Sequence, residues 1–244
     1  MEISIAAEKI FSLFGLPITN SILTTWLVMA ILILIAASIR SRLQIIPSTF
    51  QLIVELLIGG LYSVFEQVNG VKTKQYFPIL ATLFLFILFA NWIGLLPGIN
   101  AVGFVHAVHG KEVLVPFLRS PSADLNTTLA LALIAFLIFQ YYGIRSLGVG
   151  HYLGKFLNFH GPLDFFVGLL ELIQELSRVI SFAFRLFGNI FAGEVLLVVI
   201  ASFVPLILPL PFLGFELFVG IVQAFVFAML TSAFLSQATL HVEH

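Results

Sequence analysis

Two arginines, an asparagine and a glutamate interrupt a largely apolar stretch in the C-terminal part of the sequence. Residues 177–203, SRVISFAFRLFGNIFAGEVLLVVIASF, contain Arg178, Arg185, Asn189 and Glu194. An arginine at the centre of a membrane helix costs ~2.5–3.5 kcal/mol on insertion scales, so such residues usually face a bundle interior, water or a partner. Because phenylalanine and leucine surround Arg185, a functional role is the stronger hypothesis for it.

Helical geometry places most of the polar residues of this region on one face. At 100° per residue, this face lies within about 80° of Arg185. Glu194 lies on the opposite side of the helix and about 13 Å along its axis, too far for an ion pair with Arg185. The partner of Arg185 must therefore come from another helix, another subunit or water. The polar face comprises Glu171, Glu175, Arg178, Ser181 and Asn189.

For Arg178, Glu194 and Glu216, a structural role is an alternative to a functional one. Arg178 lies nearer the inner end of the span, where it could snorkel to the interface or pair structurally. Glu194 and Glu216 fall in the outer half, an arrangement that suits protons entering from outside and stopping near Arg185. The alternative for each is a structural, hydrogen-bonded carboxyl. Gln223 follows Glu216 by seven residues and so shares its face.

Small residues recur at every fourth position of the last apolar segment. Such spacing lets another helix approach closely. Ordinary helix packing explains this small-residue ridge, and the close passage of a moving partner is the alternative. The ridge comprises Gly220, Ala224, Ala228, Ser232 and Ser236.

The composition is that of a polytopic membrane protein. Hydrophobic residues make up 60% of the chain and charged residues 9%, and the mean hydropathy is +1.13. Soluble domains carry about 25% charged residues. A net charge of −1 gives no basic field for nucleic acid, and the absence of cysteine excludes disulfides and thiolate metal sites. We expect one membrane domain over residues 1–244.

Five segments are apolar enough to cross the hydrocarbon core, which needs roughly 20 residues. Residues 47–70 contain Glu55, Glu66 and a glycine pair, a pattern that predicts an amphipathic helix at the interface. The fold class is therefore an all-α membrane protein. We expect the spans at residues 21–39, 76–96, 125–142, 179–203 and 212–240.

Residues 163–203 contain no proline, which predicts one helix about 60 Å long. Because the bilayer core is only about 30 Å thick, this helix either tilts strongly or extends along or beyond the inner interface. Pro205, Pro209 and Pro211 predict the turn into the last span. The two helices should therefore form a long hairpin.

The distribution of lysine and arginine between the loops favours an N-terminus outside and a C-terminus in the cytoplasm. The start of the sequence lacks the basic region of a cleaved signal or transit peptide, so we expect a bacterial inner membrane. The inner segments would hold Arg40, Arg42, Lys72, Lys74, Arg145 and Lys155, and the outer ones Lys9, Lys111 and Arg119.

The other polar residues point to structural roles. His106 and His109 lack a nearby third ligand, so we expect no metal site. Asn91, Asp124 and Asn126 lie at span ends, where caps and interface anchors are typical. Phosphate-binding and nucleophile motifs are absent from the sequence. We therefore expect no cofactor and no catalysis by the chain itself.

The string FRLFGNIFAGE at residues 184–194 resembles subunit a of the F-type rotary ATP synthases, the stator subunit of their membrane sector. The resemblance extends to NWIGLLPG at 91–98, PSADLNTTLALAL at 121–133 and VQAFVFAMLT at 222–231. It covers most of the chain from about residue 76 onward, in matching order.

This resemblance implies that Arg185 faces a ring of rotor subunits, the c-ring, in which each subunit carries a membrane carboxyl. Two offset half-channels would reach that ring from opposite sides of the membrane. Glu194 and Glu216 would line the outer one, although some relatives have histidine in place of Glu216. Gln223 and Asn189 would lie beside the arginine. The inner half-channel would involve Glu171, Ser177, Arg178 and Ser181.

The resemblance further implies a tilted hairpin and assembly with peripheral-stalk b subunits and the rest of the synthase. Two alternatives remain at this point: an ion-coupled secondary transporter that binds an anionic substrate, and a membrane scaffold. Transporters usually contain paired repeats and broken helices, and the sequence has neither. A scaffold leaves Arg185 unexplained.

Overall fold

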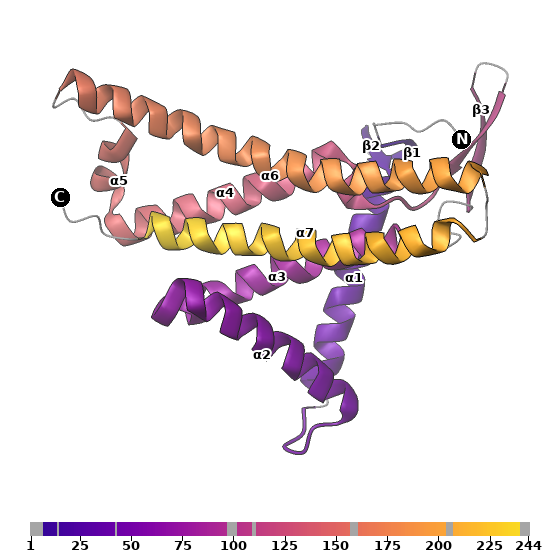
Figure 1. The fold of residues 1–244 in the computed structure, drawn as a ribbon, viewed down its shortest axis with the longest axis horizontal. Helices are drawn as coiled ribbons and strands as arrows, with labels where there is room; N and C mark the ends of the chain where they lie inside the picture. The colour runs from indigo at the N-terminus through magenta and orange to yellow at the C-terminus, as the bar shows by residue number, and fades with distance from the viewer. Residues whose placement is uncertain are drawn as a thin grey trace.

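The computed structural model describes residues 7–13, 15–41, 43–96, 102–108, 111–156, 161–203 and 207–239. Helices dominate, and α6 and α7 run side by side as a long antiparallel hairpin (Figure 1). The helices are α1 Asn20–Ser41, α2 Thr49–Asn69, α3 Thr73–Ile93, α4 Leu125–Leu147, α5 Val149–Phe156, α6 Pro162–Phe203 and α7 Pro209–Ala238, with 3₁₀ turns η1 Gly70–Lys72 and η3 Pro121–Ala123. The strands are β1 Lys9–Leu13, β2 Leu16–Thr19, β3 Gly103–Val108 and β4 Lys111–Pro116.

Five helical segments of the described residues are long and apolar enough to cross a membrane, which confirms the all-α membrane class. One of them joins α2 and α3 through η1 into a run of 45 residues. Helix α2 is the amphipathic helix expected at residues 47–70, and its place at the membrane interface stays a prediction. The five segments are Asn20–Ser41, Thr49–Ile93, Leu125–Leu147, Leu163–Phe203 and Pro209–Ala238.

The uninterrupted helix expected from residue 163 to residue 203 is confirmed by α6. The turn after it differs from expectation, because Pro209 and Pro211 belong to the first turn of α7. Proline is tolerated there, since the first N–H groups of a helix have no intrahelical acceptor. Pro205 lies outside the described residues.

Short elements that the sequence analysis did not anticipate connect the long helices. Strands β1 and β2 form one antiparallel hairpin, and β3 and β4 form another. Both hairpins lie toward the end of the bundle where α6 and α7 meet, and α5 lies at the opposite end (Figure 1). The bundle therefore has two distinct ends, which differ in the polar groups they gather.

One of the residues expected as a cap acts as expected and another does not. Asp124 is the N-cap of α4, where its carboxylate accepts a hydrogen bond from the Asn126 N–H at 3.0 Å. Asn91 caps nothing: its side chain is buried and donates to the Gly220 carbonyl of α7 at 3.0 Å. A buried side-chain amide needs a hydrogen-bond partner, and the backbone carbonyl of the neighbouring helix supplies one.

The small-residue ridge of α7 packs within the chain. Helix α3 packs more extensively against α7 than any other helix does, and Trp92 of α3 donates to the Leu217 carbonyl at 3.1 Å. A Cβ added to Gly220 would lie 3.2 Å from the Cβ of Asn91. These contacts support ordinary helix packing for the ridge. Its fully buried members are Ala224, Ala228 and Ser232.

A buried irregular segment, residues 119–124, crosses between helices before α4 begins. We call it the connecting segment. Thr24 of α1 accepts a hydrogen bond from the Arg119 backbone N–H at 3.1 Å. Ser120 donates to the Ala90 carbonyl of α3 at 3.1 Å. All six residues of the segment are buried, and its 3₁₀ turn η3 packs against α1, α3, α4 and α6.

Gly94→Ala should prevent the connecting segment from seating against α3. A Cβ at Gly94 would lie 2.5 Å from the Ser120 Cβ and 3.1 Å from its Cα, so the backbone itself must move. Overpacking of this kind costs about 1–3 kcal/mol. Thermal unfolding of the purified complex in detergent should show a lower transition temperature for this subunit.

Gly60→Ala is the matched control, because nothing lies within 4 Å of a Cβ built there. This variant should be as stable as the parent protein or slightly more stable. Equal transition temperatures for the two glycine variants would contradict the tight contact between Gly94 and Ser120.

Candidate functional site

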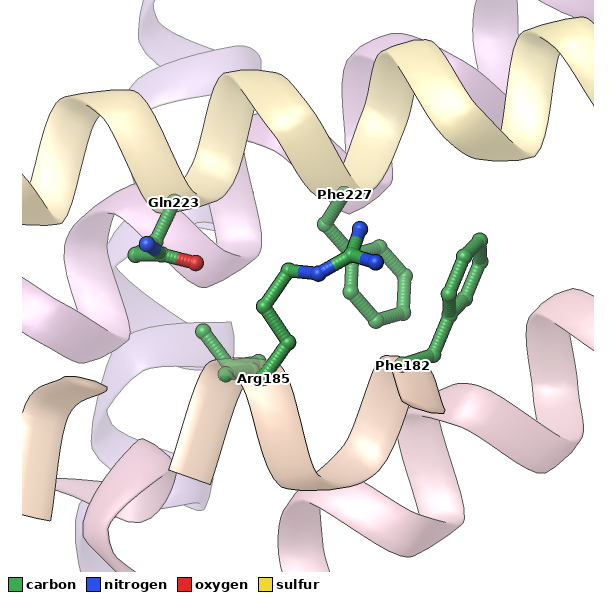
Figure 2. A pocket seen from close by; sticks show the side chains of 5 residues that line it. Phe182, Arg185, Gln223 and Phe227 are labelled. Atoms are coloured by element: carbon green, nitrogen blue, oxygen red, sulfur yellow. The ribbon is translucent and has the colours of Figure 1, made fainter. Parts of the chain in front are cut away.

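Arg185 projects from the middle of α6 toward α7. Its guanidinium lies at a small pocket between the two helices, next to aromatic side chains of both (Figure 2). Gln223 of α7 lines the same pocket, so the structure brings these two predicted site residues together. The remaining lining residues are Phe182, Leu186 and Phe227.

The charge of Arg185 is not neutralised by the described part of its own chain. Its guanidinium donates one hydrogen bond, to the Ser181 hydroxyl at 3.4 Å. Among the described residues, no carboxylate lies within ion-pair distance of it. Arg185 is also exposed on the surface of the α6–α7 hairpin. This agrees with the inference that its partner lies outside the helix.

Glu216 lies against α6 at a glycine. Helices α6 and α7 are in contact at the Phe182 and Phe227 rings, whose centroids are 5.0 Å apart. Farther along the same antiparallel hairpin, Glu216 of α7 contacts Gly193 of α6. A Cβ added to Gly193 would come within 2.1 Å of the Glu216 carboxyl. Gly193 therefore provides the space that the buried Glu216 side chain occupies, beside Glu194 in the sequence.

Glu194 pairs with a residue that sequence reasoning counted only as a loop charge. The Arg119 guanidinium of the connecting segment lies 3.5 Å from the Glu194 carboxylate. The Arg119 side chain is 8% exposed and that of Glu194 is 23% exposed. The available signal was that a carboxylate within a span needs a cation. Nothing in the local sequence indicated which cation it would be.

At the other end of the hairpin, Arg178 is structurally paired. Its guanidinium lies 2.8 Å from the Glu175 carboxylate and 3.3 Å from the Gln237 side-chain oxygen. It also stacks over the Phe234 ring, 4.4 Å from the ring centroid. These contacts support the structural explanation for Arg178, whereas its place in an inner half-channel stays a prediction.

A hydrogen-bonded chain extends from Glu175 to α5. Gln140 of α4 donates to the Glu175 carboxylate at 3.4 Å and accepts a hydrogen bond from the Tyr152 hydroxyl. Burial, followed by the nearby Glu175 charge, raises the pKa of Tyr152 to about 12. The hydroxyl therefore keeps its proton at neutral pH and remains the donor. This chain links α4, α5 and α6 to one another.

The remaining predicted residues lie along α6 without converging on one site. Asn189 and Ser177 are exposed, and the Ser177 hydroxyl donates to the Ile173 carbonyl of its own helix at 2.8 Å. Glu171 is half-buried, one turn before the paired Glu175. The described residues include no group of three metal-ligating side chains. The side chains of His106 and His109 lie outside the described part of the chain.

Comparisons with known proteins assign this arrangement to a family. A family model described as "ATP synthase A chain" matches residues 22–236. "ATP synthase subunit a" of Desulforamulus reducens is 36% identical, over 96% of this chain and 85% of the relative. The corresponding subunit of a Sulfurihydrogenibium species is 33% identical, over 89% and 98%. A relative from Propionigenium modestum, "ATP synthase subunit a, sodium ion specific", is 35% identical, over 94% and 77%. The five candidate spans of the described residues and the exposed Arg185 between α6 and α7 agree with these matches. The chain belongs to the ATP synthase A chain family.

Proposed function

We propose that this chain is the ion-conducting stator subunit of an F-type ATP synthase and that Arg185 couples ion flow to the turning of a c-ring. One observation carries the proposal: the guanidinium of Arg185 is exposed on a membrane hairpin and has no carboxylate partner among the described residues. Family membership favours this function over the secondary transporter and the scaffold.

The surroundings of Arg185 suit an apolar partner that carries an anion. Phe184, beside Arg185 in the sequence, is 55% exposed; Ile180 of α6 and Phe218 of α7, elsewhere on the hairpin, are 56% and 60% exposed. A cation within such a surface is stabilised by a partner that buries the apolar side chains and brings a carboxylate. Rotor helices that each carry one membrane carboxyl have this chemistry.

The two ends of the hairpin provide polar groups for two separate ion paths. Glu194 and Glu216 would line the outer half-channel, and Gln223 and Asn189 would lie beside the arginine. A fixed guanidinium favours the ionised form of an approaching carboxyl, so the rotor carboxyl gives up its ion as it arrives. The same charge repels cations that would cross directly. Such a leak would dissipate ~2.3 kcal/mol per charge per 100 mV. The inner half-channel would involve Glu171, Ser177, Arg178 and Ser181.

In this proposal the chain is not an enzyme by itself, and nucleotide chemistry belongs to the soluble part of the complex. Its partners are the c-ring, the peripheral-stalk b subunits and the lipid bilayer. We place it in a bacterial inner membrane with the N-terminus outside. The ion is H⁺ or Na⁺, because one relative is named as sodium ion specific.

Arg185→Ala should abolish ion-driven ATP synthesis and leave assembly of the complex largely intact. The side chain is exposed and makes a single weak hydrogen bond, so its removal disturbs little packing. ATP synthesis in membrane vesicles, per assembled complex and under imposed H⁺ and Na⁺ gradients, measures the effect. Synthesis at the parent rate would refute the proposal.

Arg185→Lys should also fail, although it keeps the charge. An ammonium group is more strongly hydrated and lacks the planar donor fork of guanidinium, so it binds the arriving carboxylate differently. ATP-driven ion pumping by this variant, followed in the same vesicles, should stay near background. Pumping at the parent rate would argue against a guanidinium-specific gate.

Gly193→Ala should displace the Glu216 carboxyl and slow ATP synthesis without unfolding the subunit. The atoms in conflict are the end of a flexible side chain, which can move away at little cost in stability. Gly214→Ala on the same hairpin is the control, since nothing lies within 4 Å of a Cβ built there. If the two variants support equal rates, the position of Glu216 beside Gly193 does not matter for ion transfer.

A further inference from the structure

Arg119 is buried in the outer part of the bundle, where the proposed ion path does not itself require a cation. Its side chain is 8% exposed, and its guanidinium lies 3.5 Å from Glu194. Taking a guanidinium out of water costs several kcal/mol, which an ion pair in a protein interior often fails to regain. Replacing such a pair with apolar residues is often neutral or stabilising. Stability alone is therefore a weak explanation for this pair.

The backbone at Arg119 and Ser120 is held by hydrogen bonds to α1 and α3, and the Arg119 side chain extends from there to α6. The Thr24 hydroxyl of α1 accepts a hydrogen bond from the Arg119 N–H. The next residue, Ser120, donates to the Ala90 carbonyl of α3 and packs against Gly94, the residue that follows α3. The guanidinium is thus supplied from a fixed position outside the α6–α7 hairpin. Groups held in this way can orient a charged side chain with little freedom to relax.

Glu216 provides the contrast with Glu194. It occupies the space at Gly193, next to Glu194 in the sequence, and is 4% exposed. In the described part of the chain, Glu216 has no hydrogen bond and no ion pair. Asp124, the other charged residue of the connecting segment, is engaged at the start of α4. Glu194 belongs to α6, and Glu216 of α7 packs against Gly193, the residue before it. Of these two acidic residues, only Glu194 is paired with a cation among the described residues.

We propose that Arg119 is a positioning residue of the outer ion path, which holds and neutralises Glu194 so that Glu216 is the carboxyl that exchanges the ion. This inference rests on the proposed function. The proposed function places Glu194 and Glu216 together in the outer half-channel, and this inference assigns them different roles.

The consequence is a difference in charge at the outer site. With Arg119 in place, the two ionised carboxylates and the guanidinium sum to one negative charge. Without it the site carries two negative charges in a poorly screened environment, where like charges interact strongly. An ion that enters is then held more tightly and released more slowly. A purely structural role for Arg119 predicts fewer working complexes with unchanged ion affinity.

The test measures ATP synthesis per assembled complex against the outside concentration of H⁺ and, separately, of Na⁺. Arg119→Met keeps the length of the side chain and removes its charge, whereas Arg119→Lys keeps the charge. We expect Arg119→Met to lower both the maximal rate and the half-saturating ion concentration, the rate by about tenfold. Arg119→Lys should retain most of the activity.

A double variant makes the test decisive. Glu194→Gln alone leaves Arg119 free to bind Glu216 and should also be slow. Arg119→Met combined with Glu194→Gln removes both members of the pair and should recover about tenfold over either single variant. Because neither member of the Arg119–Glu194 pair is left buried without the other, this variant should assemble even if Arg119→Met does not.

Two results would overturn the inference. One is parent-like kinetics for Arg119→Met, and the other is a double variant no faster than the single ones, which would make Glu194 itself the ion carrier. Arg185→Ala is measured in parallel. If Arg185→Ala still makes ATP, the proposed function fails, whereas failure in the Arg119 series alone refutes only the role of Arg119.

Discussion

The main electrostatic feature of the α6–α7 hairpin is a guanidinium, that of Arg185, with no carboxylate partner among the residues that the structure describes. Arg119 and Arg178 find carboxylates within the chain, one near each end of the α6–α7 hairpin. Arg185 lies between them and has the Ser181 hydroxyl at 3.4 Å instead. In the proposed function, the cost of a cation within the membrane would be offset by the partner that approaches the exposed face of the hairpin. Because Arg119 and Arg178 are paired with carboxylates of the chain, Arg185 is the one of these three arginines that would bind an external carboxylate.

Packing within the chain leaves this face of the hairpin available. Helices do not associate in lipid through the hydrophobic effect, so close contact and interhelical hydrogen bonds hold them together. Asn91 and Trp92 of α3 supply two such bonds to backbone carbonyls of α7, and the small residue Gly220 allows the approach. Because α3 occupies the small-residue ridge, the exposed apolar residues of α6 and α7 remain on the other side.

Periodicity along the sequence was sufficient to predict the helices but not their lateral contacts. The length of α6, the hairpin and the Asp124 cap follow from rules that act within a few residues. The ion pair between Arg119 and Glu194 joins positions 75 residues apart, and it depends on how the connecting segment folds into the bundle. The role of Asn91 was missed for the same reason, since its acceptor lies 129 residues away. Helical spacing also predicted the shared polar face, whereas burial determined which of its members became paired.

The crossing of α1 and the hairpin would give a geometric reason for the two displaced ion paths of the proposed function. Helix α1 has 22 residues, about 33 Å, and matches a hydrocarbon core of about 30 Å only when it stands nearly upright. Figure 1 shows α1 running steeply across α6 and α7, so an upright α1 makes the hairpin strongly tilted. Arg178 and Glu194 lie about 24 Å apart along the α6 axis. In a tilted helix much of that separation would be lateral, so the proposed half-channels near Arg178 and Glu194 would open at different places on opposite sides of the membrane. A direct path between them would have to pass Arg185.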